Sequence, residues 1–237
     1  MIRRMDAARV ALVAIGMLLN QAVPAAPVRA GEYVSNGGGR LIVKPRAGDG
    51  QGFSIESIGG DAQMCSLDGT LREGRAELAA MNDTCVIEFS RKGAGLQVTP
   101  TKTEACRSFC GPLASFDALY TESPAGCTKA AIKRTRDAFL PLYRHKQYAL
   151  ARAKLAPVLS SCGPLLFYVE EADVRNDLAV TLYHLGERAA CREVLEPLRA
   201  KAETSDEARR SGLPPADAEN YLLIAGKTRT NLKLCRK

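Results

Sequence analysis

Eight cysteines are the residues with the most definite chemistry in this 237-residue chain. They are Cys65, Cys85, Cys106, Cys110, Cys127, Cys162, Cys191 and Cys235. A metal site would need a second close pair or nearby histidines. Cys106-x-x-x-Cys110 has neither, because the only histidines are His145 and His184. An even number of cysteines is typical of disulfides in an exported protein. The sequence therefore predicts four disulfides and no metal or other cofactor.

Apart from the cysteines, the polar residues form no motif typical of a hydrolase or of a nucleotide-binding protein. His145 and His184 fall near the turns of expected helical hairpins, where polar residues are ordinary. The chain contains no Gly-x-Ser-x-Gly elbow, P-loop or dinucleotide fingerprint. The neighbouring carboxylates Glu170 and Glu171 suit the N-terminus of a helix, where negative charge is favourable. We therefore expect a protein without enzymatic activity.

Residues 1–30 have the layout of a secretory signal peptide. Three arginines among the first nine residues precede a mostly apolar stretch over 10–23, and the segment Val28-Arg29-Ala30 supplies small residues for a cleavage site. The apolar stretch is too short to span a membrane comfortably. We expect cleavage near Ala30 and a periplasmic or secreted mature protein without a stable membrane span. The alternative is an uncleaved N-terminal anchor.

The composition and charge exclude several classes of protein. Hydrophobic residues make up 46% and charged residues 25%, which is ordinary for a globular protein and unlike disordered or collagen-like chains. Removing residues 1–30 takes away four basic residues and one acidic residue, so the formal net charge falls from +7 to +4. With no Trp, six Phe and seven Tyr, an aromatic platform for stacking bases is not expected. We expect no nucleic-acid partner.

The chain changes character at Pro124-Ala125-Gly126, which predicts two domains of an α+β protein. Residues 31–123 contain short stretches separated by glycine-rich turns, as in a small antiparallel β-barrel or sandwich. The expected strands are 40–44, 52–58, 64–67, 75–78, 85–89, 95–99 and 115–120. Residues 127–237 are rich in helix formers. The expected helices are 130–144, 148–160, 170–185, 188–202 and 217–234, with a loop at 203–215.

The helical part contains an internal repeat of 40 residues, since Leu142-Tyr143 matches Leu182-Tyr183. A period of this length is typical of stacked helical hairpins. In an antiparallel hairpin the two outer ends are neighbours, which predicts the disulfide Cys127–Cys162. The same geometry predicts Cys191–Cys235 between the second hairpin and the last helix. The other four cysteines allow three connectivities in the β-domain, of which we favour Cys65–Cys110 with Cys85–Cys106.

This pattern resembles the tetratricopeptide repeat. The segment Asn176-Asp177-Leu178-Ala179, followed by Leu182-Tyr183 and Leu185-Gly186, is similar to the first helix and turn of that motif. The resemblance implies a groove, formed by the first helices of the repeats, that binds an extended peptide, and it places Asn176 where such proteins contact the peptide backbone. The residues expected in the groove are Arg136, Tyr143, Arg175, Asn176 and Tyr183. The alternative is that the two tyrosines are packing residues.

A second resemblance covers about residues 40–123. The segments CVIEFSRKGAGLQV (85–98), CRSFCG (106–111) and SFDALY (115–120) are similar to the β-domains of periplasmic lysozyme inhibitors and related exported proteobacterial proteins. The Ser-Gly-x-x-Tyr loop by which such inhibitors block c-type lysozyme is absent. We therefore expect a non-enzymatic binding or scaffold protein that engages a protein or peptide in the bacterial envelope. The alternative is an inhibitor or immunity protein against a lysozyme or another peptidoglycan-degrading enzyme.

Overall fold

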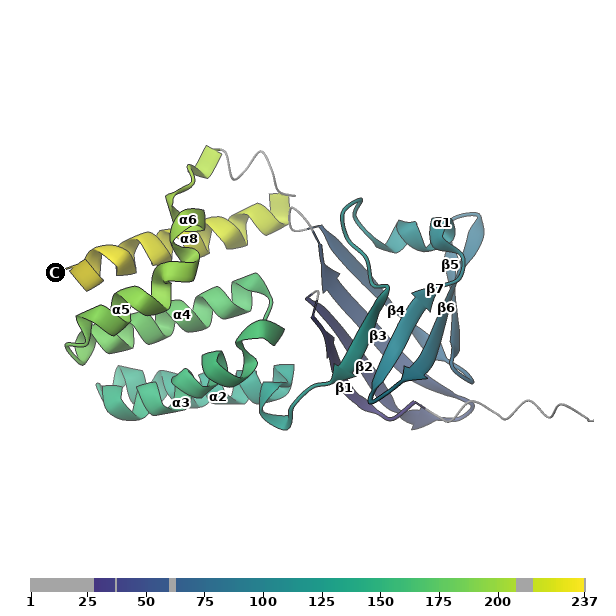
Figure 1. Ribbon diagram of the computed structural model, residues 1–237, viewed down its shortest axis with the longest axis horizontal. Coiled ribbons are helices and arrows are strands. Elements are labelled where there is room, and N and C mark those ends of the chain that lie inside the picture. The colour runs from purple at the N-terminus through teal and green to yellow at the C-terminus, as the bar shows by residue number, and fades with distance from the viewer. Residues whose placement is uncertain (1–27, 37, 60–62, 208–214, 237) are drawn as a thin grey trace, which may run out of the picture.

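The structure is a computed structural model that describes residues 28–36, 38–59, 63–207 and 215–236 (Figure 1). It is an α+β protein in which a nearly closed antiparallel sheet of eight strands is followed by helices. The predicted signal peptide lies almost wholly outside the described residues, which begin at Val28. Residues 208–214 of the predicted loop lie outside them as well.

The eight strands form a meander that curls into a barrel, which we call the barrel unit (residues 28–123). The strands are β1 (Gly31–Ser35), β2 (Gly39–Ala47), β3 (Gly50–Ile58), β4 (Met64–Leu71), β5 (Arg75–Ala80), β6 (Asp83–Lys92), β7 (Gly95–Pro100) and β8 (Ala118–Glu122). They pair in the order β4-β3-β2-β1-β8-β7-β6-β5. A tight turn connects β4 to β5, and in it the N–H groups of Arg72 and Arg75 each donate to the other residue's carbonyl at 2.8 Å. Sequence reasoning missed β1 and placed β8 too early, at 115–120.

Alternate side chains fill the interior of the barrel and form its core, as expected for a barrel of this size. The largest of those with almost no exposed surface are Leu41, Phe53, Ile55, Ile87, Val98 and Tyr120. Phe53 and Phe89 pack edge to face, with ring centroids 5.1 Å apart. Gly69 is required beside them, because a Cβ atom there would lie 2.5 Å from Leu78 Cδ2 and 3.1 Å from Phe53 Cε1. The protein's own side chains therefore occupy this interior.

Two disulfides hold a short helical segment against one end of the barrel (Figure 1). This segment consists of α1 (Thr103–Cys106) and a 3₁₀ turn (Arg107–Phe109). Cys106 is joined to Cys85 in β6, and Cys110 is joined to Cys65 in β4. These are the pairs that the sequence analysis favoured. Because they anchor one loop to two strands, they fix the position of that loop.

The helices after Pro124 form what we call the helical unit (residues 125–236). They are α2 (Lys129–Arg144), α3 (Tyr148–Cys162), α4 (Tyr168–His184), α5 (Arg188–Leu195), α6 (Arg199–Glu203) and α8 (Pro215–Arg236). α2 with α3 and α4 with α5 are helical hairpins, and α8 packs against α4, α5 and α6. The expected helix 188–202 is interrupted by a 3₁₀ turn at Pro197, which has no backbone N–H to donate.

The two hairpin turns have equivalent hydrogen bonds 40 residues apart. The N–H of Gln147 donates to the carbonyl of Leu142 at 2.9 Å, and the N–H of Glu187 donates to that of Leu182 at 3.0 Å. The residue before each donor has a positive φ, 59° in the first turn and 78° in the second. The sequence repeat is therefore also a repeat of backbone structure.

Two further disulfides join the helices, and they are the two pairs expected from hairpin geometry. Cys127–Cys162 closes the first hairpin, and Cys191–Cys235 joins the start of α5 to the end of α8. A disulfide of this kind typically stabilises a small unit by about 2–4 kcal/mol. The two bonds hold the first hairpin closed and keep the last helix in place.

Candidate functional site

The helical unit presents a face on which α2, α4 and α8 are linked by side chains; we call it the α2–α4–α8 face. Arg136 of α2 forms ion pairs with Asp173 and Asp177 of α4, and Lys227 of α8 forms an ion pair with Asp173. The two aspartates lie four residues apart and therefore project from the same side of α4. These contacts place α4 between the other two helices.

The row of charges on this face is electrically balanced, with two cations and two anions. Nη2 of Arg136 lies 3.1 Å from Oδ2 of Asp177, and Nη1 lies 3.5 Å from Oδ2 of Asp173. Nζ of Lys227 lies 3.0 Å from Oδ1 of Asp173. Pairs with this degree of exposure contribute only about 0–1 kcal/mol each. The row therefore orients its side chains more than it stabilises the fold.

The surroundings of Asp177 shift the pKa of its carboxyl. Burial raises the pKa of its carboxyl above the ordinary value, although the nearby Arg136 guanidinium acts in the opposite direction. A carboxylate next to a guanidinium offers an acceptor beside several donors. Such a pair matches the N–H and C=O groups of a peptide bond.

Two hollows with apolar linings flank the charged row. The first, of about 400 Å³, lies between α2 and α4 and includes Ile132, Phe139 and Leu140. The second, of about 490 Å³, lies between α4 and α8 and includes Leu222 and Leu223. Leu140 is 42% exposed and Leu223 is 59% exposed. Apolar hollows beside a few convergent polar groups are the usual features of a binding site.

Asn176, predicted to contact a peptide, is buried between α4 and α8 with 2% of its surface exposed. Its amide nitrogen donates to the carbonyl of Ala172 at 2.9 Å and to Oγ1 of Thr228 at 3.0 Å. Its amide oxygen accepts a hydrogen bond from Asn231 at 3.0 Å. The structure therefore uses this side chain to join two helices, and its polar atoms face α4 and α8.

The other predicted groove residues do not share one surface. Arg175 forms an ion pair with Glu171 at 2.6 Å and donates to the carbonyl of Val194 in α5. Tyr143 and Tyr183 lie beside His184 at the hairpin turns, with ring centroids 5.9 and 5.4 Å from the His184 ring. Of the five residues, Arg136 belongs to the charged row of the α2–α4–α8 face, and the buried Asn176 lines the second hollow. The surroundings of the tyrosines favour the packing interpretation.

Sequence reasoning missed most of the residues on this face. Asp173 and Asp177 carry a local signal, because their spacing places both on one side of the expected helix. Lys227 and Leu223 carry none, because their position depends on how α8 packs against α4. That packing is set by contacts between residues about 50 positions apart, such as Asn176 with Thr228.

A buried arginine joins the barrel unit to the helical unit. Arg40 of β2 is 2% exposed, and its Nε lies 3.1 Å from Oε1 of Glu32 in β1. Its Nη1 and Nη2 donate to the two carboxylate oxygens of Glu170 in α4 at 3.2 and 3.1 Å, and its guanidinium lies 4.8 Å from the Phe167 ring centroid. Glu32 also accepts the N–H of Lys129, the first residue of α2, at 2.9 Å. Arg40 thus contacts α4 through Glu170 and is linked to α2 through Glu32, so this pair of side chains connects both helices that border the first hollow.

Within the described parts of the chain, no group of three or more His, Cys, Asp and Glu side chains could hold a metal ion. None of the helices that the structure describes is both long and apolar enough to cross a membrane. No protein-family model, curated protein or solved structure matches this chain.

Proposed function

We propose that the protein is a non-enzymatic binding protein of an oxidising compartment outside the cytoplasm, periplasmic or secreted. In this proposal it binds a segment of a protein partner on the α2–α4–α8 face. The four disulfides support the location, because such bonds persist where the environment is oxidising. The observation that carries the binding role is the exposure of Leu140 and Leu223 in the two hollows beside the charged row.

The chemistry of the face suits a short segment with apolar side chains on both sides of a polar centre. The apolar side chains would enter the hollows at Leu140 and Leu223. The peptide group between them would meet Arg136 and Asp177, whose facing atoms lie 3.1 Å apart. Because the row is balanced in charge, we expect affinity to depend weakly on ionic strength.

Site-specific cross-linking tests this proposal. A photoreactive benzoylphenylalanine would replace Leu140 in one variant and Leu223 in another, and Leu119 in the control. Leu119 is 40% exposed but lies on β8 of the barrel unit. After illumination in an envelope extract, we expect both helical positions to capture the same protein and the control to capture none of it. Capture of one protein from Leu119 alone would contradict the proposal.

The captured partner then allows a quantitative test. We expect Leu140→Asp and Leu223→Asp each to weaken its binding by about tenfold or more, as for residues near the centre of an interface. Leu119→Asp is the matched control and should leave the affinity within about twofold. Circular dichroism and thermal unfolding would show that all three variants remain folded.

A specific observation favours an inhibitor of a peptidoglycan-degrading enzyme as the second candidate function. Met81 stands at the β5–β6 turn with 97% of its surface exposed, and Leu113 in the loop before β8 is 58% exposed. Apolar side chains on projecting loops suit insertion into an enzyme cleft. This function predicts stoichiometric inhibition of a lysozyme or amidase that Met81→Ser relieves and Leu223→Asp does not. The reverse pattern would support the α2–α4–α8 face instead.

A further inference from the structure

The two units carry net charges of opposite sign. Residues 31–123 contain nine Lys and Arg against twelve Asp and Glu, a net charge of −3. Residues 124–237 contain 20 Lys and Arg against 13 Asp and Glu, a net charge of +7. The modest positive charge of the whole chain therefore conceals a basic helical unit.

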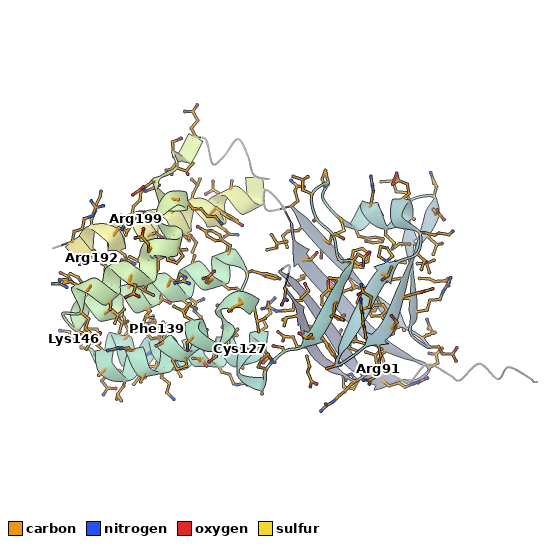
Figure 2. The ribbon with its side chains drawn as sticks, viewed as in Figure 1. Arg91, Cys127, Phe139, Lys146, Arg192 and Arg199 are labelled. Carbon is orange, nitrogen blue, oxygen red and sulfur yellow. A yellow bond between two sulfur atoms is a disulfide. The ribbon has the colours of Figure 1, made fainter. Side chains whose placement is uncertain are left out.

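Much of this positive charge lies at the end of the helical unit that is farthest from the barrel. We call this region the distal end; it comprises the turns 145–147 and 185–187 and the last turn of α8 (Figure 1). Figure 2 shows Lys146 and Arg192 there. Contacts make it continuous: the Tyr148 and His184 rings stack 4.5 Å apart, and Arg192 donates to the carbonyl of Cys235 at 3.2 Å.

Cations outnumber anions at the distal end. The basic residues on or next to it are Arg144, Lys146, Arg152, Arg188, Arg192, Lys233 and Arg236. The acidic residues there are Glu187, which forms an ion pair with Arg152 at 2.6 Å, and Glu193. The helical unit thus presents a basic surface at the end of the molecule's long axis.

Internal contacts account for only some of these cations. Arg188 donates to the carbonyl of Tyr183 at 2.8 Å, and Arg192 donates to that of Cys235, so these two satisfy carbonyls at helix ends. Arg144, Lys146 and Arg236 are exposed, and none of the described carboxylates forms an ion pair with them. They are available to an external anion.

Apolar and aromatic side chains accompany the cations. Leu150, in the first turn of α3, is 56% exposed. Tyr143, Tyr148 and Tyr183 are half-buried around His184. Tyrosine rings beside Lys and Arg are favourable at the boundary between lipid headgroups and water, and an exposed leucine adds a group that enters the acyl boundary.

We infer that the distal end docks on a membrane surface that contains anionic phospholipids, whose phosphate groups Arg144, Lys146 and Arg236 contact while Leu150 enters the interface. The inference does not rest on the proposed function of the α2–α4–α8 face. A bilayer fits better than a soluble polyanion because an exposed leucine and tyrosines accompany the cations. Docked by this end, the protein would hold the barrel unit away from the membrane (Figure 1).

Vesicle co-sedimentation of the processed full chain tests this inference. The probes are vesicles of phosphatidylcholine alone and vesicles in which about a third of the lipid is phosphatidylglycerol. We expect binding to the anionic vesicles only, and loss of binding as salt shortens the Debye length from about 10 Å at 0.1 M to about 3 Å at 1 M. The triple variant Arg144→Glu/Lys146→Glu/Arg236→Glu should bind at least about tenfold more weakly.

A matched variant separates a local site from overall charge. Lys44, Arg91 and Lys92 are exposed on the barrel unit, and Figure 2 shows Arg91 far from Lys146. Reversing these three changes the net charge equally, and we expect binding within about twofold of the wild type. Leu150→Asp should also weaken binding.

Three results would overturn the inference. The first is that the protein does not bind anionic vesicles at low salt. The second is that both triple variants lose binding equally. The third is that the protein binds soluble polyglutamate but not vesicles, which would indicate an acidic protein as the partner. Circular dichroism of each variant would exclude unfolding as the cause of lost binding.

Discussion

The barrel unit and the helical unit bury their apolar residues in different ways. In the barrel, consecutive strands pair around a nearly closed circle, and side chains such as Phe53 and Tyr120 fill the interior. The helical unit is a stack of hairpins, each of which packs on the next. Its disulfides join helices to one another, whereas those of the barrel tie a loop to strands.

This difference decides where each unit can recognise another molecule. The sheet is nearly closed and β4 and β5 are its edge strands, so contacts with other molecules are left mainly to its loops. A stack of hairpins leaves faces that no further repeat covers. The exposed Leu140 and Leu223 lie on such a face, whereas the most exposed apolar residue of the barrel, Met81, lies on a turn.

The largest effect is expected at the junction between the units. Arg40→Met would leave the carboxylates of Glu32 and Glu170 without their cation. The side chains of Glu32 and Glu170 are 10% and 28% exposed. Breaking a buried ion pair from one side typically costs about 3–5 kcal/mol. We expect urea unfolding to show a loss of this size, and two transitions, one for each unit, in place of one.

Two variants control this experiment. Arg46→Met removes an exposed arginine from the same strand and should change stability by less than about 0.5 kcal/mol. Arg40→Met combined with Glu32→Gln and Glu170→Gln removes the uncompensated charges and should recover part of the loss. If Arg40→Met behaved like Arg46→Met, the units would be coupled by something other than this ion pair.

Local patterns in the sequence were sufficient to predict most elements of both units. Alternation predicted strands such as 52–58, observed as Gly50–Ile58, and the 40-residue repeat predicted two hairpins. The predictions that failed concern features that depend on contacts between residues far apart in the sequence. β1 has five residues and is stabilised by pairing with β2 and β8, and the break at Pro197 could not be told from Pro157, which stays inside α3.

The candidate site could be predicted less well, for the same reason. The resemblance to a repeat family directed attention to Asn176, but whether that side chain is exposed depends on α8, a helix outside the repeat. Arg40 offers no signal in the sequence, since an arginine within a strand usually faces solvent. Its role depends on Glu170, 130 residues away.

An intermediate effect is expected at Asn176, where the helical unit relies on polar packing. Asn176→Ala would remove the side-chain donor to Thr228 Oγ1 and the side-chain acceptor of Asn231, although Thr228 keeps its bond to the Ile224 carbonyl and Asn231 its bond to the backbone carbonyl of residue 176. The loss of these two buried hydrogen bonds typically costs about 1–3 kcal/mol. Asn220→Ala, at an exposed position of α8, should be nearly neutral. Urea unfolding would measure both variants. Weaker partner binding without a loss of stability would return Asn176 to the role of a contact residue.

A smaller loss of stability, confined to the barrel unit, is expected when the residues before Gly31 are removed. Val28 is 5% exposed and packs in the barrel core, and the hydroxyl of Tyr33 donates to the carbonyl of Arg29 at 2.7 Å. We therefore expect a chain that starts at Gly31 to be about 1–2 kcal/mol less stable than one that starts at Pro27. Mass spectrometry of the exported protein would show which start occurs. Equal stability of the two chains would mean that these contacts contribute nothing.

The smallest effect concerns acid, to which one aspartate in each unit should respond in opposite directions. Since burial raises the pKa of Asp177, the folded protein holds this proton more tightly than the unfolded chain. The contribution of Asp177 to the stability of the fold therefore becomes more favourable as the pH falls. This change runs from neutral pH through the raised pKa towards the unfolded value of about 3.9. In the barrel, hydrogen bonds from the Thr84 N–H and from Lys102 lower the pKa of Asp83, so its contribution is lost as pH falls.

Asparagine substitutions separate these two responses. Because Asp177 is 36% exposed, water screens its interactions, and Asp177→Asn should change stability by about 0.5 kcal/mol at most. The free energy of unfolding of the variant, relative to that of the wild type, should be highest at neutral pH. This difference should shrink as the pH falls. Asp83→Asn should show the opposite slope. Urea unfolding across pH 3–7 measures both slopes. Parallel slopes would mean that the Arg136 guanidinium lowers the pKa of Asp177 more than burial raises it. In that case the charged row would stabilise the helical unit much as surface ion pairs stabilise the barrel.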